Sequence, residues 1–532
     1  MIRLSPFAGM APRVSGKLLS NEQAQLAKNC KLKSGELRAL RGTSSVWTPT
    51  KVGNKQSIHL FAKQFWFHWL TDVDVVRGAI PSDTTERTYY TGDGAPKVTN
   101  AEVATQGEST NYPNVSYLLG VPAPEAALSA AVVGGEGGYD PVDMVDRFWV
   151  YTYVSAWGEE GPPSPPSLMT SMGPDQTADL SGIGVGPTGA YNIATKRIYR
   201  SSSGSAGAAL LFEAEIPVAQ DTYSSTATDD QLGEEISTTL FDPPPETLKG
   251  LTGMANGMMA GFTGKDVWLC EPYQPHAWPE DYRQAVDFDV VGLASFGTTL
   301  VVTTEGYPYV ANATDPMSAV LQKIELEQAC VSKRSIVSLG SSGAAYASPD
   351  GLVVIGPGGA MVVTEGLLTR DEWQAYQPDS MIGCSHDGQY IAFYNNGAKQ
   401  GGLIIDPRGN GLVEIDLYAE GAHVDLVTDS LYLLVNNEIV KWDAGDLMDY
   451  AWKSKRFTTP PLNFPAGMVV ADSYDSLTMK VYADKILKHT QTITDARPFR
   501  LPAGFRATEW EIQIEGTDNV HEARLGTMGE MA

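Results

Sequence analysis

Turn signals recur every 40 to 50 residues or so through the second half of the chain. They lie at Gly257, Gly297, Gly351, Gly388 and Ser430, with spacings of 40, 54, 37 and 42 residues. Each turn precedes an apolar stretch of strand character, a second turn and another such stretch. A repeat of this length with about four strands per unit is typical of a β-propeller. With residues 51–100 as a first blade and residues 246–450 holding the others, the repeat predicts about six blades.

The composition favours a mostly β chain. Of 532 residues, 53 are glycine and 33 are proline without any period, which indicates many turns and argues against collagen or a helical bundle. Hydrophobic residues make up 42% of the chain, enough to form globular cores, so wholesale disorder is excluded. A chain of this length exceeds a single compact core, which predicts several domains.

Two β-sandwiches are expected beside the propeller. Residues 140–245 contain the strand RFWVYTYVSAW, the proline-rich bend GEEGPPSPPS and the later segments RIYRS and FEAEI, an order that resembles a fibronectin type III sandwich. Residues 101–139 show little periodicity and are predicted to be a linker. Residues 451–532 include LTMKVYADKILKHTQTI and RATEWEIQIEG, whose apolar and polar residues alternate, so they predict a C-terminal β-sandwich.

Residues 1–50 are predicted to form an extended arm with one short helix. Ser20 and Gln23 have the spacing of a capping box, and NEQAQLAKNC permits a helix. Proline and glycine before it prevent regular structure, so the arm must pack along its own body or along a neighbouring subunit. We expect residues 1–19 to be required for assembly but not for folding of the body. The predicted contacts with the neighbouring subunit are Phe7, Pro12, Arg13 and Leu18.

The net charge of −25 restricts the partners. Affinity for nucleic acid comes from Lys and Arg that displace counterions, so an acidic chain will not bind nucleic acid over its general surface. The same charge argues against an anionic membrane surface. No apolar run is long enough to span a membrane, and the N-terminus lacks a secretory signal, so no membrane anchor is expected. The four widely spaced cysteines are expected to be buried thiols of a protein made in a reducing cytoplasm.

Motifs for catalysis, cofactors or metals are missing from the sequence. Gly184, Gly186 and Gly189 have dinucleotide-loop spacing, but Pro187 and the lack of a strand–helix unit favour a flexible loop. No phosphate loop, zinc motif, nucleophile elbow or calcium loop is present, and the seven histidines are scattered. The sequence therefore predicts that the protein is not an enzyme and has no cofactor, metal or catalytic residue.

Several segments resemble tail proteins of tailed bacteriophages. They are the opening PFAGMAPRVSGKLLSNEQAQLAKNCKLKSGELRALRG and the phrases YYTGDGAPKVT, YLLGVPAP, YTYVSAWGEEGPPSPPS and LFDPPPETLKGL. Residues 1–260 resemble that family in motifs and the remainder in layout, most closely the propeller-containing tail hub or nozzle of short-tailed phages. The resemblance implies a virion protein made in the bacterial cytoplasm. It also implies a ring of six copies that contacts portal or adaptor proteins and tail fibre or needle proteins.

The leading hypothesis is therefore a structural tail protein that forms part of the DNA-ejection conduit. Genomic DNA would pass without specific binding, because acidic residues facing the lumen would repel its phosphates. Two alternatives remain open. One is a receptor-binding adhesin of the tail, and the other is a tail-associated glycan hydrolase.

Overall fold

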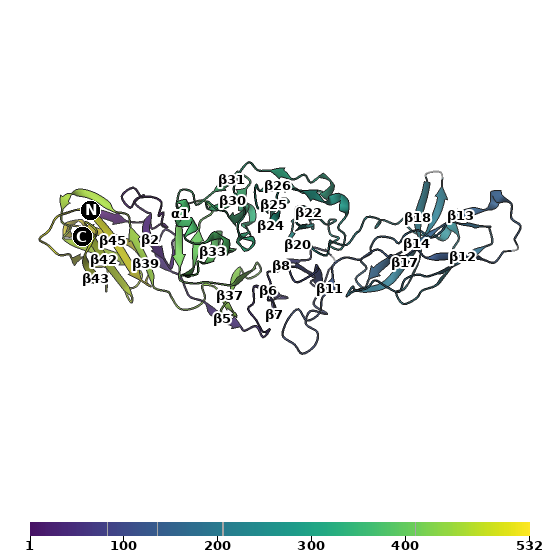
Figure 1. Ribbon diagram of the computed structural model, residues 1–532. Coiled ribbons are helices and arrows are strands. Elements are labelled where there is room, and N and C mark those ends of the chain that lie inside the picture. Colours follow the sequence, from purple (N-terminus) through teal and green to yellow (C-terminus); the bar gives the residue numbers. More distant parts are fainter. Residues whose placement is uncertain (82, 136, 205–206, 410, 532) are drawn as a thin grey trace.

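The computed structural model describes residues 1–81, 83–135, 137–204, 207–409 and 411–531. Figure 1 shows an elongated molecule with three parts in a row: a C-terminal sandwich that also contains the N-terminus, a central body, and an inserted sandwich at the opposite end. Strands dominate the described chain, and its one α-helix is the five-residue α1 (Arg370–Gln374). The prediction of a mostly β protein is confirmed. None of the described helices is long and apolar enough to cross a membrane.

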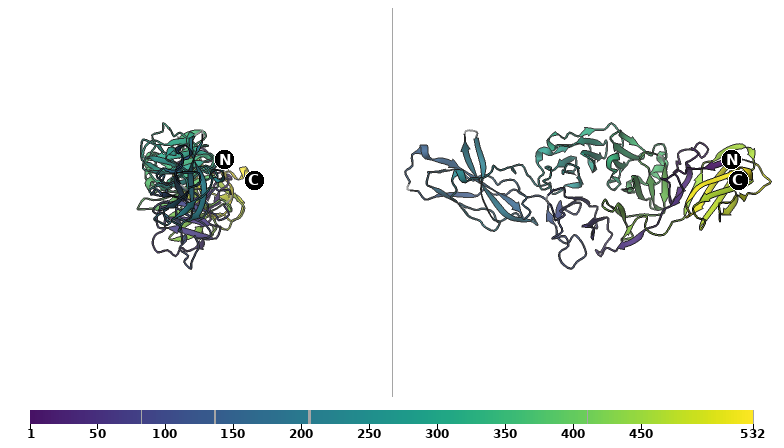
Figure 2. Two further views of the ribbon diagram at one scale, coloured as in Figure 1. Left: turned by 90° about the vertical axis from the view of Figure 1, so that its right-hand side faces the viewer. Right: turned by 180° about the vertical axis from the view of Figure 1, so that it is seen from behind.

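Within the described residues, seven small antiparallel sheets form the propeller-like central body, seen most openly in the right-hand view of Figure 2. The first is a hairpin of β6 (Ser57–Phe61) and β7 (Phe65–Trp69), and the second holds β8 (Asp74–Arg77), β9 (Thr88–Thr91), β10 (Lys97–Thr99) and β11 (Tyr117–Leu118). The third holds β20 (Lys249–Gly253), β21 (Met259–Thr263), β22 (Asp266–Leu269) and β23 (Gln284–Ala285). The fourth holds β24 (Val290–Phe296), β25 (Thr299–Thr304), β26 (Tyr309–Asn312) and β27 (Gln322–Lys323).

The remaining three sheets complete this series. The fifth holds β28 (Val337–Ser338), β29 (Ala344–Ala347), β30 (Leu352–Gly356) and β31 (Gly359–Val362). The sixth holds β32 (Ile382–His386), β33 (Gln389–Asn395), β34 (Gln400–Ile405) and β35 (Leu412–Ile415), which form one end of a ten-stranded sheet that continues through the N-terminal segment into the C-terminal sandwich. The seventh holds β36 (Gly421–Asp425), β37 (Ser430–Val435), β38 (Glu438–Lys441) and the N-terminal strand β5 (Ser44–Trp47).

Buried hydrophobic clusters join each of these sheets to the next. One cluster, for example, contains Phe262 of the third sheet and Val302 of the fourth. The first sheet contacts both the seventh and the second: Trp66 packs with Leu434, and the rings of Trp69 and Tyr90 lie 5.3 Å apart. Residues 51–100 therefore supply strands to two sheets, which corrects the expectation of a single blade there.

The inserted sandwich consists of two three-stranded sheets that share one core. The strands are β12 (Ser129–Val133), β16 (Thr177–Ser181) and β19 (Tyr223–Ser225) in one sheet and β14 (Trp149–Ser155), β17 (Ile193–Gly204) and β18 (Gly207–Pro217) in the other. A small pair, β13 (Val145–Arg147) and β15 (Thr170–Met172), lies beside them. Trp149 and Leu180 are buried between the sheets. The predicted linker 101–139 is wrong in part, because it contributes β11 to the central body and β12 to this sandwich.

The C-terminal sandwich also has two sheets, and its strands cover residues 450–526. One sheet contains β39 (Tyr450–Ser454), β40 (Phe457–Leu462), β42 (Leu477–Ala483), β43 (Ile486–Thr492) and β45 (Ala507–Gly516). The other contains β41 (Ala466–Ala471), β44 (Phe499–Arg500), β46 (Val520–Gly526) and the first strand of the chain, β1 (Ile2–Leu4). The apolar residues of β45 predicted to share a face, among them Trp510 and Ile512, are buried.

The N-terminal segment runs through three sheets. β1 pairs with β46, β2 (Ala24–Lys28) lies between β35 and β39, and β5 completes the seventh sheet. β3 (Cys30–Lys31) and β4 (Arg38–Ala39) form a small pair between them. The predicted short helix is wrong. Gln23 does accept from the Ser20 N–H at 3.2 Å, but the following residues gain backbone partners on both sides, and such tertiary pairing overrides a weak helix propensity.

Candidate functional site

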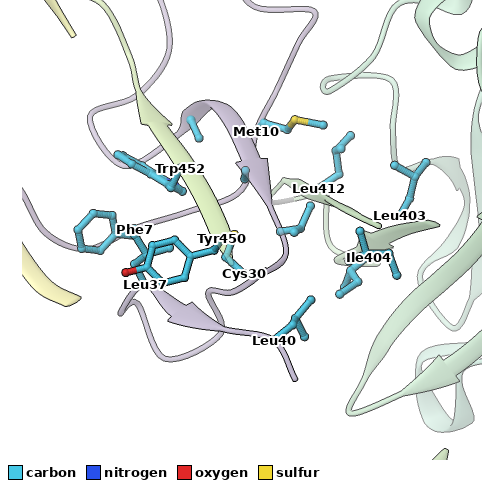
Figure 3. Packing of buried hydrophobic residues seen from close by; sticks show 14 of the residues in the cluster. Phe7, Met10, Cys30, Leu37, Leu40, Leu403, Ile404, Leu412, Tyr450 and Trp452 are labelled. Carbon is cyan, nitrogen blue, oxygen red and sulfur yellow. The ribbon is translucent and has the colours of Figure 1, made fainter. Parts of the chain in front are cut away.

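Phe7, predicted to contact a neighbouring subunit, instead belongs to the core of its own chain. Its side chain is 2% exposed and packs edge to face on Trp452, with ring centroids 4.9 Å apart. The Trp452 indole N–H donates to the carbonyl of Ala8 at 2.9 Å. Figure 3 shows Phe7 and Trp452 close together in the cluster that surrounds the N-terminal segment. The prediction of an intersubunit role for Phe7 is wrong, because a side chain already enclosed in its own core has little surface left to offer.

The other three predicted contacts lie further along the same segment. Pro12 is half-buried, and Arg13 is exposed but held by its own chain, since its Nη1 donates to the Glu365 carbonyl at 2.5 Å. Leu18 is 78% exposed. The structure therefore does not bring the four residues together on one surface, and Leu18 is the member whose side chain is open to a partner.

The N-terminal segment approaches the sixth sheet too closely for side chains at two positions. A Cβ added to Gly9 would lie 2.8 Å from the backbone nitrogen of Leu412, and one added to Gly411 would lie 2.9 Å from the Gly9 Cα. Met10 and Leu412 exchange backbone hydrogen bonds of 2.9 and 3.2 Å across this contact. Residues 1–19 thus form part of the folded body, which contradicts the expectation that they can be removed without affecting it.

A cluster of ion pairs surrounds Lys333 and Arg334, which lie in a 3-10 turn just before β28. Lys333 Nζ is 2.8 Å from a carboxylate oxygen of Asp72 and 2.8 Å from one of Asp74. Arg334 lies 3.7 Å from Asp72 and donates to the Gln56 carbonyl at 2.6 Å and to that of Glu420. A small polar cavity of about 160 Å³ is lined by Gln56, Asp72, Asp74, Lys333 and Arg334, among others. The cluster links segments preceding four different sheets.

The electrostatics of this cluster favour a stable network of ion pairs. Burial alone would lower the pKa of Lys333, but the facing carboxylates of Asp74 and Asp72 raise it above the usual value for lysine. The ammonium therefore stays charged at any physiological pH. A permanently protonated lysine held by two carboxylates can neither accept a proton nor attack a carbonyl, so the geometry suits the cluster to holding segments together.

A larger cavity of about 430 Å³ lies between the N-terminal segment and the sixth and seventh sheets. Several of its charged lining residues neutralise one another: Lys33 Nζ lies 2.5 Å from Oδ1 of Asp387, and Arg408 Nη2 lies 2.9 Å from Oδ2 of Asp406. His386 is half-buried and lines this cavity. Buried Phe7 and Trp442 form part of its apolar side.

The cysteines confirm the expectation of buried free thiols. Each is buried and none forms a disulfide: Cys30, Cys270, Cys330 and Cys384. Burial raises the pKa of the Cys384 thiol to about 12 and that of Cys270 to about 12, so neither is ionised at neutral pH. In the part of the chain that the structure describes, His, Cys, Asp and Glu side chains form no group of three or more suited to a metal ion.

The charge is distributed unevenly along the molecule, a feature that the total net charge conceals. Residues 1–50 carry eight Lys and Arg against two Asp and Glu, whereas residues 140–245 carry four against fifteen. Residues 485–506, in the C-terminal sandwich, carry five basic residues and one acidic residue. A count by segment would have revealed this polarity from the sequence. In the folded chain the acidic sandwich and the C-terminal sandwich lie at opposite ends (Figure 1).

Comparisons with known proteins identify no relative. No protein-family model matches the chain, and no curated protein matches it. Among solved structures, BBS1N in complex with ARL6DN is 9% identical, with coverage of 75% of this chain and 96% of that chain and a TM-score of 0.30. The N-terminal domain of Nup159 is 11% identical, with 61% and 87% coverage and a TM-score of 0.23. PorZ, from the type-IX secretion system of Porphyromonas gingivalis, is 8% identical, with 90% and 82% coverage and a TM-score of 0.26. Likenesses this weak carry no argument.

Proposed function

We propose that the chain is a structural component of a bacteriophage tail, at the position of the nozzle or hub, as its sequence resemblance implies. The observation that carries this proposal is the path of the N-terminal segment. β2 joins β35 and β39, so that one hydrogen-bonded sheet runs from the central body into the C-terminal sandwich. β1 and β5 tie the same segment to a sheet at each side of this junction. A molecule bound together in this way is suited to bearing load in a particle.

We further propose that the seven sheets of the central body form a closed seven-bladed β-propeller, where the sequence predicts about six blades. The order of the shared hydrophobic clusters supports closure, since they link the second sheet through to the seventh and the first sheet to both of these. β5, from the start of the chain, completes the sheet formed by β36, β37 and β38. In such an arrangement only short, protected strand edges remain. The inserted sandwich is proposed as a fibronectin type III-like unit.

In this proposal the chain acts as a ring of copies, six by the resemblance, in contact with portal or adaptor proteins and with fibre or needle proteins. Genomic DNA passes through without specific binding. The acidic balance of residues 140–245 supports this passage, because a surface of like charge does not retain DNA phosphates. The ion network around Lys333 adds rigidity to the central body.

Localisation in an intact phage particle tests the proposal. We expect cryo-electron microscopy of particles to place the chain as a ring in the tail below the portal, and negative-stain images of purified protein to show closed rings. A monomer or trimer that binds on a glycan array would favour the adhesin. Release of reducing sugars from host glycans would favour the hydrolase. Absence of the chain from purified particles would refute the proposal.

A further inference from the structure

One edge of the C-terminal sandwich carries exposed cations that form no ion pair within the described residues. It comprises β43, whose one partner among the described strands is β42, and β44, whose one partner among them is β41. We name this surface the basic edge and define it by Lys485, Ile486, Leu487, Lys488, Arg500 and Arg506, all exposed. In the described part of the chain, none of its four cations has a carboxylate within 4.0 Å.

Contacts between the two strands and their loops gather these residues on one surface. Lys488 Nζ lies 5.1 Å from the centre of the Phe505 ring, which brings β43 next to the loop that contains Arg506. The rings of His489 and Phe499 stack with centroids 6.1 Å apart, which brings β43 next to β44. Ile486 is 59% exposed and Leu487 46% exposed. An edge strand also presents unpaired backbone N–H and C=O groups.

The opposite end of the molecule carries the complementary charge. We name this surface the acidic tip and define it by Asp143, Asp146, Asp175, Val142 and Val145, all exposed. Asp146 accepts from the Ser171 hydroxyl and Asp175 accepts from the Tyr139 hydroxyl, which draws the loops of the tip together. Across the described residues, no Lys, Arg or His lies within 4.0 Å of these three carboxylates. Val142 is 83% exposed, so the tip, like the basic edge, offers apolar surface among its charges.

We propose that the basic edge of one copy binds the acidic tip of a second copy. Both surfaces combine unpaired charge of one sign with exposed aliphatic side chains, and the two signs are opposite. Complementary charge of this kind steers association and selects the partner. Because the two surfaces differ, the contact is heterologous, and repeating it generates a ring or an open chain of copies. The inference rests on the proposed function only for its biological setting, since the contact itself follows from the surfaces.

Charge reversal on each surface tests this contact in the full-length chain. The edge variant is K485E/K488E/R500E/R506E, and the tip variant is D143K/D146K/D175K. A matched control, K265E/R370E, reverses two exposed charges on the central body. Sedimentation velocity over a range of concentrations would measure association at about 50 mM and about 500 mM NaCl, since added salt screens exposed charges. Circular dichroism would establish that each variant is folded.

We expect the wild type and the control to associate at low salt and to dissociate at high salt. Each reversal variant alone should remain monomeric, because its edge and tip then carry the same sign. An equimolar mixture of the edge and tip variants should associate again, since the reversed edge now faces the reversed tip. A monomeric wild type at low salt, a folded variant that associates like the wild type, or a mixture that stays monomeric would each overturn the proposal. Association that depends on the basic edge but not on the acidic tip would also overturn it, because the occupant would then be a different acidic partner.

These outcomes are separate from those of the localisation experiment. A chain that associates through these surfaces but is missing from phage particles would leave the contact in place and refute the proposed function. A chain that forms a ring in the tail through other surfaces would do the opposite.

Discussion

Replacing Phe7 with alanine should destabilise the protein itself and should not act through contacts between copies. The side chain is almost fully buried and lies edge to face against Trp452. Removing a buried phenylalanine costs about 3–5 kcal/mol, because the apolar contacts are lost and a cavity remains. We therefore expect the free energy of unfolding of the C-terminal sandwich, with its attached N-terminal segment, to fall by about that amount.

Urea denaturation followed by tryptophan fluorescence would measure this loss, since Trp452 lies in the affected core. With an m-value of about 2 kcal/mol per molar urea, a loss of this size lowers the midpoint by roughly 2 M. Limited proteolysis of the native protein provides a second readout. Cleavage within residues 1–20 should become faster, because Phe7 anchors this part of the chain to the body.

Leu18→Ala is the matched control. Leu18 belongs to the same segment but is exposed, so its truncation should change stability by less than about 0.5 kcal/mol. If F7A unfolds at the wild-type urea concentration and its N-terminal segment resists protease as before, the packing of this segment is not as described. Loss of oligomers in F7A without loss of stability would instead support an intersubunit contact for Phe7.

Three further predictions concern Lys333, His521 and the four cysteines. K333M removes the ammonium that the two carboxylates share and should lower stability by about 1.5–3 kcal/mol, with partial recovery in K333M/D74N; a thermal melt equal to that of the wild type would contradict the ion network. A hydrogen bond to Asp472, supported by a second to Glu36, raises the pKa of His521, so its contribution to stability is present below about pH 6.5 and is lost as pH rises through the folded pKa. H521Q should therefore lose this part of the pH dependence of stability. Thermal melts from about pH 5.5 to about pH 9 would detect the loss, because that range spans the transition. Native protein should not react with a thiol reagent such as DTNB at pH 8, and four thiols per chain should react in denaturant; rapid labelling of the native protein would contradict the burial of its cysteines.

Strand content and several core faces could be predicted from the sequence, because alternation records which side chains face the core. In RATEWEIQIEG, Trp510, Ile512 and Ile514 share a buried face as the pattern indicates. The same pattern fails for Glu511, which is expected to be half-exposed but is 1% exposed. Lys453 Nζ lies 3.0 Å from its carboxylate, and Gln25 Nε2 donates to it at 2.8 Å. Both partners are distant in sequence, so local periodicity could not reveal them.

The strand pairing of the N-terminal segment could not be predicted either, because its partners are distant in sequence. Its glycines and prolines correctly indicate an irregular path, but its local composition says nothing about which sheets it joins. Helix-permissive residues 24–28 became a strand because two strands far along the chain, β35 and β39, offered backbone partners on both sides. Composition therefore does not distinguish the residues of this segment that the body encloses from those that stay exposed.

The strand pairing of the N-terminal segment also indicates where contacts between copies should be sought. A segment that joins three sheets through its backbone has used many of its hydrogen-bonding groups within its own chain, as β2 has with β39 along one edge and with β35 at Lys28. A strand edge or a charged group that is not paired within the chain can still bind another copy. Surfaces with such groups lie at the two ends of the molecule. The N-terminal segment and the central body then make the molecule rigid, and the surfaces at the two ends of the molecule select the partner. If association proved insensitive to charge at both ends but was lost on truncating Leu18, the interface would lie along the N-terminal segment after all, and this division of roles would be wrong.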